Sequence, residues 1–480
     1  MGPANPLPML RIFVTHVPLL VYTFWAHTLS VSPTSKDWDL LTELVTRFLR
    51  SLLNTRHPQP LTKTQAISIR DPGIQGRIWV SKVTLPKPEK SNLVETFYAA
   101  FDLLRDGTNQ TTGRPEMVDG AVEAEWNGFR SGVSRIATQP RISEEEKYKM
   151  MMAEVKSDVT ILLMDPATHR AATVKLARLS GGRCLSIRYR LAPQNPFPAA
   201  LLDALVAYLS LIYPPPGALH DTVPASNIVF AGDSAGGGLA FGLLQLILAL
   251  HGPDKPGTML WYGETVTLPV PAGVATNSAW LDTTHALPSV TANARYDYLP
   301  LPLPRVLPPA CSIWPVDPPR CNLYANDSCL LHPLVSPLTA QSWAHAPPLF
   351  LVTGEEMLSD ETFFLASRAA AQGVPVTLEH YKAMPHCFAM IMTWLGSSKR
   401  CFKSWAGFCR AAVEDPASVQ CTMGTVIATK SFAESPLDVV SATELTLDEI
   451  LALMREARQR RIDVVAGLNQ ADAARAMPKL

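Results

Sequence analysis

A serine between two glycines is the residue of this chain best suited to nucleophilic chemistry. Ser234 is the centre of the pentapeptide 232–236, which has the form G-x-S-x-G. An apolar, β-prone run at 227–231 precedes it, and an apolar run with helical character follows. This setting predicts a sharp bend that exposes the serine hydroxyl, with the N–H of Ala235 as a candidate oxyanion donor. The alternative is a glycine-rich loop with an inert serine.

The two partners that a catalytic serine needs lie further along the chain. A serine hydroxyl becomes a strong nucleophile when a histidine takes its proton and a carboxylate orients that histidine. An acidic stretch, 355–361, follows a predicted strand at 349–353, and His386 follows a predicted strand at 374–381. Both lie where parallel strands end, at the edge where open sheets build their sites. The alternative for a single histidine is an ordinary surface or core position.

Several motifs taken together indicate a family. They are Y-R-L-A-P at 189–193 with P-F-P-A-A at 196–200, G-D-S-A-G-G at 232–237, E-M-L-S-D-E at 356–361 and M-P-H at 384–386. With them the chain resembles the hormone-sensitive-lipase-like branch of the α/β-hydrolases, and within it a fungal group of lipases and steryl acetyl hydrolases. The resemblance extends over about 157–410, and more loosely over the N-terminal half.

The resemblance implies a serine carboxylic-ester hydrolase that forms an acyl-enzyme from lipophilic esters, such as short-chain acyl esters of a sterol or lipid. Ser234 would be the nucleophile and His386 the base. Glu356 stands where the family usually has the aspartate of a D-P-L-x-D-E motif and would be the acid. Asp360, one helical turn into the next helix, is the alternative acid, and Asp203 would make a structural contact. No metal or organic cofactor is implied.

One departure from the family pattern concerns the oxyanion hole. The family has an H-G-G-G-type motif after the strand that precedes Y-R-L-A-P, and its backbone N–H groups bind the oxyanion. Here the predicted strand at 160–162 runs directly into 163–170, as if about eight residues had been removed between the two. Either the natural protein keeps such a segment, or the chain has lost it. A loss favours a second hypothesis, a catalytically impaired relative that binds lipid or another protein; a peptidase on the same fold is a third.

The composition of the chain bears on which partners, metals and modifications we expect. The 480 residues hold 42 basic and 42 acidic side chains, so nothing favours nucleic acid. The eight cysteines form no C-x-x-C pair, which argues against zinc or thioredoxin chemistry. Cys311, Cys321 and Cys329 lie close together in sequence and are free thiols unless an oxidising compartment pairs them. Asn109 and Asn326 begin glycosylation sequons, which matter only in the secretory pathway.

The chain divides into four predicted parts. Residues 1–35 are an apolar segment with three interpretations: a weak membrane anchor, an interfacial segment, or a flap over a lipid-binding cleft. The first two would place the protein at a membrane, such as that of the endoplasmic reticulum, and otherwise we expect it in the cytoplasm. Residues 36–156 form an N-terminal cap and the first strands. Residues 157–412 form the catalytic core, with a Pro-rich insertion at 265–348 that we interpret as a lid. Residues 413–480 form an extension with an amphipathic helix.

The order of predicted elements indicates an α/β protein: a mostly parallel central sheet with helices on both faces, plus cap segments. In the core we expect strands at 158–163, 183–189, 227–231, 349–353 and 374–381, and helices at 167–179, 199–212 and 360–372. Outside it we expect an amphipathic helix at 37–53 over the core or site, paired strands at 67–85 around a turn at 71–73, a helix within 90–113, and helices at 141–156 and 444–461. The last two begin with capping boxes, Ser143 with Glu146 and Thr446 with Glu449.

Overall fold

A computed structural model of the chain describes residues 7–53, 59–69, 71, 73–107, 109–117, 120–164, 169–252, 256–302 and 308–476. Within these residues, ten strands form one sheet in the order β1-β2-β4-β3-β5-β8-β9-β10-β11-β12. The strands from β4 to β11 are parallel, and β1, β2 and β12 are antiparallel to their neighbours. The bounds are β1 Ile78–Leu85, β2 Val122–Phe129, β3 Thr160–Leu163, β4 Arg183–Arg188, β5 Ile228–Asp233, β8 Gly273–Asn277, β9 Leu349–Gly354, β10 Val376–Tyr381, β11 Met423–Ile427 and β12 Glu434–Leu437.

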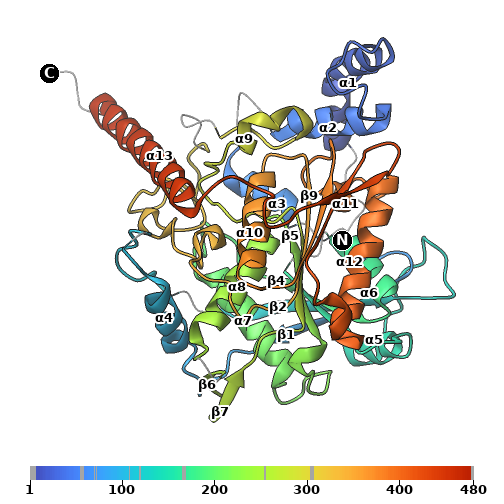
Figure 1. Ribbon diagram of the computed structural model, residues 1–480, viewed down its shortest axis with the longest axis vertical. Helices are drawn as coiled ribbons and strands as arrows, with labels where there is room; N and C mark the ends of the chain where they lie inside the picture. Colours follow the sequence, from blue (N-terminus) through green and yellow to red (C-terminus); the bar gives the residue numbers. More distant parts are fainter. Residues whose placement is uncertain are drawn as a thin grey trace.

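Helices cover both faces of this sheet (Figure 1). α6 and α12 pack on one face, and α7, α8 and α10 pack on the other. Their bounds are α6 Arg170–Ser180, α7 Ala199–Ile212, α8 Ala235–Leu250, α10 Ser359–Ala371 and α12 Gly396–Glu414. The other helices are α1 Leu7–Thr28, α2 Leu40–Leu53, α3 Leu61–Ser68, α4 Leu93–Leu104, α5 Glu144–Met152, α9 Ser289–Ala292, α11 Phe388–Ile391 and α13 Leu447–Ala476, and β6 Gly257–Trp261 pairs with β7 Glu264–Leu268 in a separate hairpin. The predicted α/β fold is confirmed.

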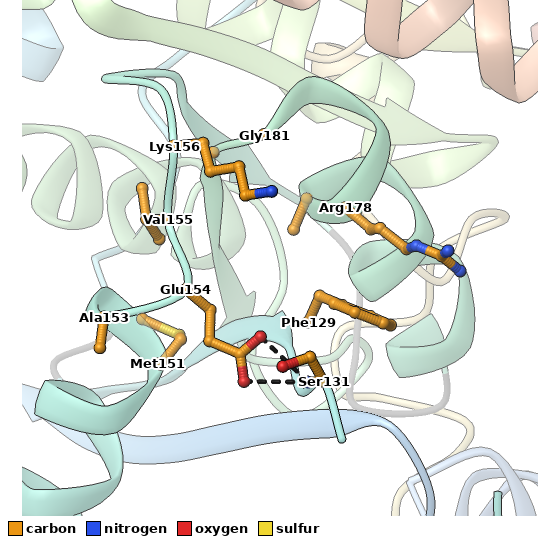
Figure 2. Close-up of a pocket in the computed structure, with 11 residues that line it drawn as sticks. Phe129, Ser131, Met151, Ala153, Glu154, Val155, Lys156, Arg178 and Gly181 are labelled. Atoms are coloured by element: carbon orange, nitrogen blue, oxygen red, sulfur yellow. Dashed lines mark hydrogen bonds between the residues drawn. The ribbon is translucent and has the colours of Figure 1, made fainter. Parts of the chain in front are cut away.

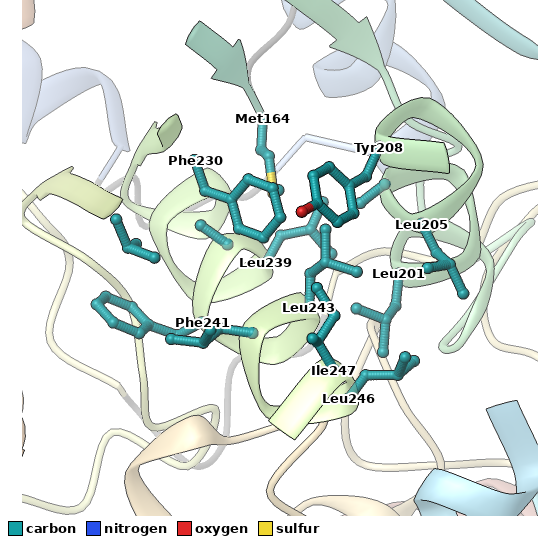
Figure 3. Close-up of a cluster of buried hydrophobic side chains, with 14 of the residues drawn as sticks. Met164, Leu201, Leu205, Tyr208, Phe230, Leu239, Phe241, Leu243, Leu246 and Ile247 are labelled. Carbon is teal, nitrogen blue, oxygen red and sulfur yellow. The ribbon is translucent and has the colours of Figure 1, made fainter. Parts of the chain in front are cut away.

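The core on the α7–α8 face surrounds α8, the helix that follows Ser234. Every residue of α7 is buried, as expected for a helix that is apolar on all sides and lies between a sheet and another helix. The rings of Tyr208 from α7 and Phe230 from β5 meet edge to face at 4.7 Å, and Leu239 and Leu243 of α8 lie beside them (Figure 3). Each such side chain contributes about 1.5–3 kcal/mol when fully buried. α8 is therefore held firmly from its first turn onward.

Local signals in the sequence predicted their elements well. α7 has the predicted bounds, and α6 ends at Gly181, whose φ of 79° is left-handed. Both capping boxes form. Ser143 Oγ accepts a hydrogen bond from the N–H of Glu146 at 3.1 Å, and the Glu146 carboxylate accepts one from the N–H of Ser143 at 2.9 Å. The capping box of α13 is built in the same way.

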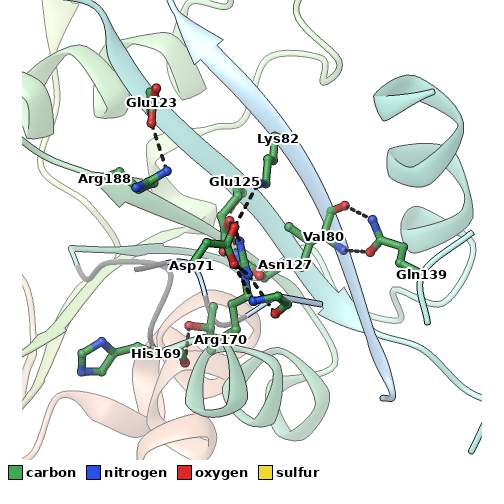
Figure 4. A network of polar contacts seen from close by, with 12 residues as sticks. Asp71, Val80, Lys82, Glu123, Glu125, Asn127, Gln139, His169, Arg170 and Arg188 are labelled. Carbon is green, nitrogen blue, oxygen red and sulfur yellow. Dashed lines mark hydrogen bonds and ion pairs between the residues drawn. The ribbon is translucent and has the colours of Figure 1, made fainter. Parts of the chain in front are cut away.

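The predicted pairing of strands within 67–85 is wrong. Residues 61–68 are helical (α3), and β1 pairs with β2, which lies some 40 residues further along the chain. Asp71 does not turn a hairpin: it forms ion pairs with Arg170 of α6 and with Lys82 of β1 (Figure 4). Because these partners are distant in sequence, no local pattern could reveal them.

Two predicted domain boundaries also need correction. The segment 265–348 is not wholly an insertion, since β8 lies within it and forms the strand of the sheet between β5 and β9. Only two of the five residues of β8, Val274 and Thr276, are strong strand formers, and a Cβ on Gly273 would lie 3.1 Å from the Phe408 ring, so close packing favours glycine at the start of this strand. The boundary at 412 is likewise too early, because β11 and β12 of the C-terminal part extend the sheet.

The predictions on membrane-spanning helices, cysteines and glycosylation sequons remain. No helix within the described ranges combines the length and the apolar character needed to cross a bilayer. All eight cysteines are free thiols. Of the two sequon asparagines, Asn109 is buried and donates to the carbonyl of Leu104, whereas Asn326 is exposed.

Candidate active site

The turn between β5 and α8 gives Ser234 a strained backbone. Its φ is 50° and its ψ is −117°, a conformation that costs a residue with a side chain about 1–3 kcal/mol. Strand and helix meet so closely here that a Cβ on Gly232 would lie 2.4 Å from the carbonyl carbon of Gly236. The carbonyl of Ser234 accepts hydrogen bonds from the N–H groups of Gly238 and Trp280. Gly232 is therefore required by packing, and the predicted elbow forms.

Three side chains from separate loops meet at this turn. His386 Nε2 lies 2.9 Å from Ser234 Oγ, and His386 Nδ1 lies 2.5 Å from Glu356 Oε2. The second oxygen of Glu356 accepts hydrogen bonds from the Thr353 hydroxyl and from the N–H of Gly354. Glu356 and His386 are buried, while Ser234 is half-buried. The arrangement suits proton transfer from the serine to an imidazole that a carboxylate orients.

The other two acids singled out in the sequence lie elsewhere. Asp360 is in the first turn of α10, where its carboxylate accepts a hydrogen bond from the N–H of Ser289 at 2.8 Å. It does not contact His386, so the structure offers no support for it as the alternative acid. Asp203 pairs with Arg190 at 2.7 Å and accepts that residue's N–H, which is the structural contact that we expected.

Charge at the site is set by burial and by the neighbouring groups. Burial lowers the pKa of His386, but the Glu356 carboxylate outweighs this, with help from Asp297 and Asp233, and the pKa ends above its ordinary value. Burial raises the pKa of Glu356, yet the imidazole and the hydrogen bonds that Glu356 accepts bring it below its ordinary value. The pair therefore favours imidazolium beside carboxylate, the charge state that forms during nucleophilic attack.

Two residues that the sequence analysis missed support the histidine and its acid. Ser278, which directly follows β8, donates a hydrogen bond that helps to lower the pKa of Glu356, and its hydroxyl accepts the N–H of Cys387. Asp297 is fully buried and accepts the N–H of Met357 at 2.8 Å. Both lie in the segment that we had interpreted as a lid. Recognition of β8 as a core strand would have pointed to Ser278.

Comparisons with known proteins place this chain in a family. A family model described as the α/β-hydrolase fold matches residues 160–390. An acetyl-hydrolase of Streptomyces hygroscopicus is 30% identical over 251 residues, which cover 52% of this chain and 72% of the relative. The chain belongs to the α/β-hydrolase family. An esterase of Acinetobacter venetianus is 26% identical over 241 residues, covering 50% of this chain and 68% of its own. A hormone-sensitive lipase from a metagenome library has a TM-score of 0.49 and 23% identity, over 77% of this chain and 98% of that structure.

The oxyanion side of this α/β-hydrolase depends on a short connection. β3 pairs with β4 and β5 as far as Leu163, and the N–H of Met164 donates to the carbonyl of Ala231 at 2.9 Å. Leu163 and Met164, which follow the point where the family has its H-G-G motif, therefore continue the strand pairing here. Residues 165–168 lie outside the described residues. The chain resumes at His169, whose Nε2 lies 3.6 Å from the Asp233 carboxylate. Ala235, in the first turn of α8, stays the candidate donor, because helical N–H groups there lack an intrahelical acceptor.

A buried arginine fixes the far end of that connection. Arg170, the first residue of α6, places its guanidinium 2.7–2.8 Å from both oxygens of Glu125 in β2 and also pairs with Asp71 (Figure 4). The start of α6 is thus attached to the sheet and to the N-terminal segment. Met164, before the undescribed residues, and Arg170, after them, are therefore both bonded to the sheet.

The N-terminal part contacts the loops that carry the site. The indole N–H of Trp38 donates to the carbonyl of Ala383, three residues before His386. Arg50 of α2 donates to the carbonyl of Asp297 at 2.7 Å, and the Tyr296 hydroxyl donates to Asp37. Of the two alternatives for the helix predicted at 37–53, the cap above the active site fits the hydrolase better, because these bonds join α2 and the residues just before it to both loops.

An apolar cavity of about 180 Å³ lies alongside the first turn of α8. Ala235 and Gly238 form one wall of this cavity, one and four residues after the nucleophile. Mostly apolar side chains line the rest, among them Leu191, Trp280 and Val335. An ester bound at Ser234 can place an apolar group here.

A second, larger cavity has a volume of about 500 Å³ (Figure 2). Residues 153–156, before β3, and Gly181 and Gly182, before β4, contribute to its lining. It therefore opens at the edge of the sheet opposite to the triad. The Glu154 carboxylate is engaged there by the N–H of Ser131. In open α/β sheets, sites lie at the carboxyl ends of the strands, so the smaller cavity is the candidate substrate site of this hydrolase.

Proposed function

We propose that this chain hydrolyses lipophilic carboxylic esters through an acyl-enzyme on Ser234. The observation that carries the proposal is the continuous hydrogen-bonded line from Ser234 through His386 to Glu356, next to an apolar cavity. The relatives named esterase and acetyl-hydrolase support the same class of reaction. The direct test is release of p-nitrophenol from p-nitrophenyl esters by the purified protein.

The steps follow from the geometry. His386 takes the proton of Ser234 while the serine oxygen attacks the carbonyl carbon, and the N–H of Ala235 donates to the oxyanion. The tetrahedral intermediate collapses, the C–O bond to the alcohol breaks, and the alcohol leaves with the proton from His386. A water molecule then gives its proton to His386 and attacks the acyl carbon. The bond between that carbon and Ser234 Oγ breaks, Oγ takes the proton back from His386, and the free acid leaves. Glu356 stabilises the imidazolium in both halves.

The cavity indicates short acyl groups. A dry apolar cavity of about 150 Å³ holds a molecule the size of benzene, so 180 Å³ accepts a chain of up to about six carbons. Each methylene that the cavity buries is worth about 0.8 kcal/mol, close to a fourfold gain in binding. We therefore infer esters of short acids with a larger lipophilic alcohol.

A chain-length series tests the cavity. We expect kcat/KM for p-nitrophenyl esters to rise from acetate to about hexanoate and to fall for decanoate. Leu191→Ala removes three carbons from the cavity wall and should move the optimum to chains two or three carbons longer. Leu179→Ala, at an exposed leucine outside the cavity, should leave the profile unchanged. An unshifted optimum in Leu191→Ala would mean that the acyl group binds elsewhere.

The raised pKa of His386 predicts a particular pH dependence. The base must be neutral, so below the folded-state pKa kcat/KM should fall about tenfold per pH unit. Because that pKa lies above the ordinary 6.5, the acidic inflection should lie above pH 6.5 as well. A pH profile with p-nitrophenyl butyrate measures it, and an inflection well below 6.5 would contradict the geometry at Glu356.

A second candidate function rests on the missing H-G-G segment between 160 and 170. Loss of one oxyanion donor costs about 10²–10³-fold in rate, and loss of the whole loop would cost more. On this hypothesis the chain binds lipid without turnover. A fluorophosphonate probe separates the two: covalent labelling that Ser234→Ala removes supports the hydrolase, and lipid binding without labelling supports the second candidate.

A further inference from the structure

The first two helices enclose an apolar groove that the catalytic machinery does not use. α1 and α2 pack against each other at one end of the molecule (Figure 1), with the rings of His16 and Phe48 in edge-to-face contact at 5.1 Å. The groove has a volume of about 640 Å³. Its lining is entirely apolar and consists of Val17, Leu20, Val21, Phe24 and Trp25 of α1 with Leu44, Val45 and Phe48 of α2.

The side chains around this α1–α2 groove are open to solvent. Val21 is 50% exposed, Phe24 42% and Trp25 56%, and Tyr22 beside them is 64% exposed. Contiguous apolar surface of this kind marks an interaction site in soluble proteins. Residues 14–31 contain no Asp, Glu, Lys or Arg. The α1 side of the groove can thus enter an apolar phase without the cost of desolvating an acidic or basic side chain of Asp, Glu, Lys or Arg.

The chemistry of the rim favours a lipid surface as the occupant. Tryptophan and tyrosine prefer the headgroup level of a bilayer, and apolar side chains enter just below it. Among the described residues near the groove, Arg47 is paired with the buried Glu43, and the exposed Lys36 and Asp39 carry opposite charges, so these four residues add no net positive charge. We propose that the α1–α2 groove docks on a neutral phospholipid surface, with apolar burial rather than charge as the source of affinity.

Firm contacts join this docking surface to the active site. His27 Nδ1 of α1 lies 2.6 Å from the Glu43 carboxylate of α2, and Arg47 lies 2.9 Å from the same carboxylate. Arg50, further along α2, donates to the carbonyl of Asp297, next to the Tyr298 ring that lies 6.1 Å from the ring of His386. The lipid surface would therefore lie at a fixed position relative to Ser234. Docking would then bring lipophilic esters from the lipid surface to Ser234, and this role rests on the proposed function.

Vesicle co-sedimentation of the full chain tests the docking. We expect wild-type protein to bind phosphatidylcholine vesicles equally at 0.1 M and 1 M salt, where the screening length falls from about 10 to about 3 Å. Val21→Glu with Trp25→Glu should weaken the partition coefficient at least about tenfold, because two side chains lose their apolar burial. Leu103→Glu with Ile136→Glu is the matched control, since these apolar residues are even more exposed but lie outside the groove.

Three outcomes would overturn the docking. The first is the absence of binding to phosphatidylcholine, and the second is binding only to anionic vesicles that salt abolishes. The third is a wild-type dimer in light scattering that Val21→Glu with Trp25→Glu makes monomeric, which would make a second copy the occupant. Val17→Ser with Phe24→Ser provides a second, milder variant if the glutamates perturb folding by circular dichroism. Vesicle binding is measured without an ester substrate, and p-nitrophenyl butyrate hydrolysis is measured without lipid. Failure of the docking proposal and failure of the proposed function can therefore be told apart.

Discussion

Ser234→Ala is expected to lower kcat/KM for p-nitrophenyl butyrate by about 10⁶-fold, the loss typical of removing the nucleophile of a catalytic triad. The reason is geometric, because Ser234 Oγ is the atom that His386 Nε2 faces at 2.9 Å. The alanine variant keeps the elbow, since Gly232 and Gly236 still meet closely. Initial rates of the wild-type protein and of the Ser234→Ala variant, both corrected for spontaneous hydrolysis, measure the loss.

A serine control separates chemistry from folding. Ser210 is buried in α7, and its hydroxyl has no hydrogen-bond partner among the described residues. Ser210→Ala should therefore keep kcat/KM within about twofold. If Ser234→Ala retained more than a tenth of the wild-type rate, the acyl-enzyme on Ser234 would be the wrong mechanism. If circular dichroism showed the Ser234→Ala variant to be unfolded, labelling of Ser234 in the wild-type protein by the fluorophosphonate probe would still test its role as the nucleophile.

Glu356→Gln should cost about 10⁴-fold in kcat, whereas Asp360→Asn should change it less than threefold. The glutamine keeps the shape but loses the charge that raises the pKa of His386, and its amide N–H₂ cannot accept the N–H of His386. Loss of an orienting carboxylate leaves the wrong imidazole tautomer at the serine. Asp360 lies at Ser289 and does not reach the histidine. Steady-state kinetics of both variants give the comparison.

The pH profile adds a readout that a structural role would not move. Removal of the Glu356 charge should shift the acidic inflection of kcat/KM to lower pH, since Glu356 is the main group that raises the pKa of His386. Asp360→Asn should leave the inflection unchanged. The reverse pattern, with a large loss in Asp360→Asn and an unshifted inflection in Glu356→Gln, would assign the acid to Asp360.

Local sequence patterns were enough for much of the site. The G-x-S-x-G turn, the loops after β9 and β10 and the chain order from Ser234 to Glu356 to His386 are local signals, because each depends on a strand and the few residues that follow it. Helix starts such as that of α5, with Ser143 and Glu146, are equally local. Such features are determined within a few residues, so the sequence predicts them.

Local sequence patterns could not predict the contacts between distant segments of the chain. The sequence left Glu356 and Asp360 as alternatives four residues apart, and only the position of His386 above the sheet separates them. β8 was missed because it is short and only Val274 and Thr276 among its five residues are strong strand formers, while Gly273 is explained by its packing against the distant Phe408. Asp71 resembled a turn residue and became the partner of Arg170 in α6.

The sequence by itself determined the family, and it predicted the nucleophile and the order of its partners, because short motifs carry these signals. Only the tertiary structure decided which carboxylate meets the histidine and that Ser278 and Asp297 join it. It also decided that the apolar faces of α1 and α2 form an open groove tied to the active site. The physical reason is that burial, charge coupling and surface exposure depend on neighbours in space, which the chain supplies from segments hundreds of residues apart.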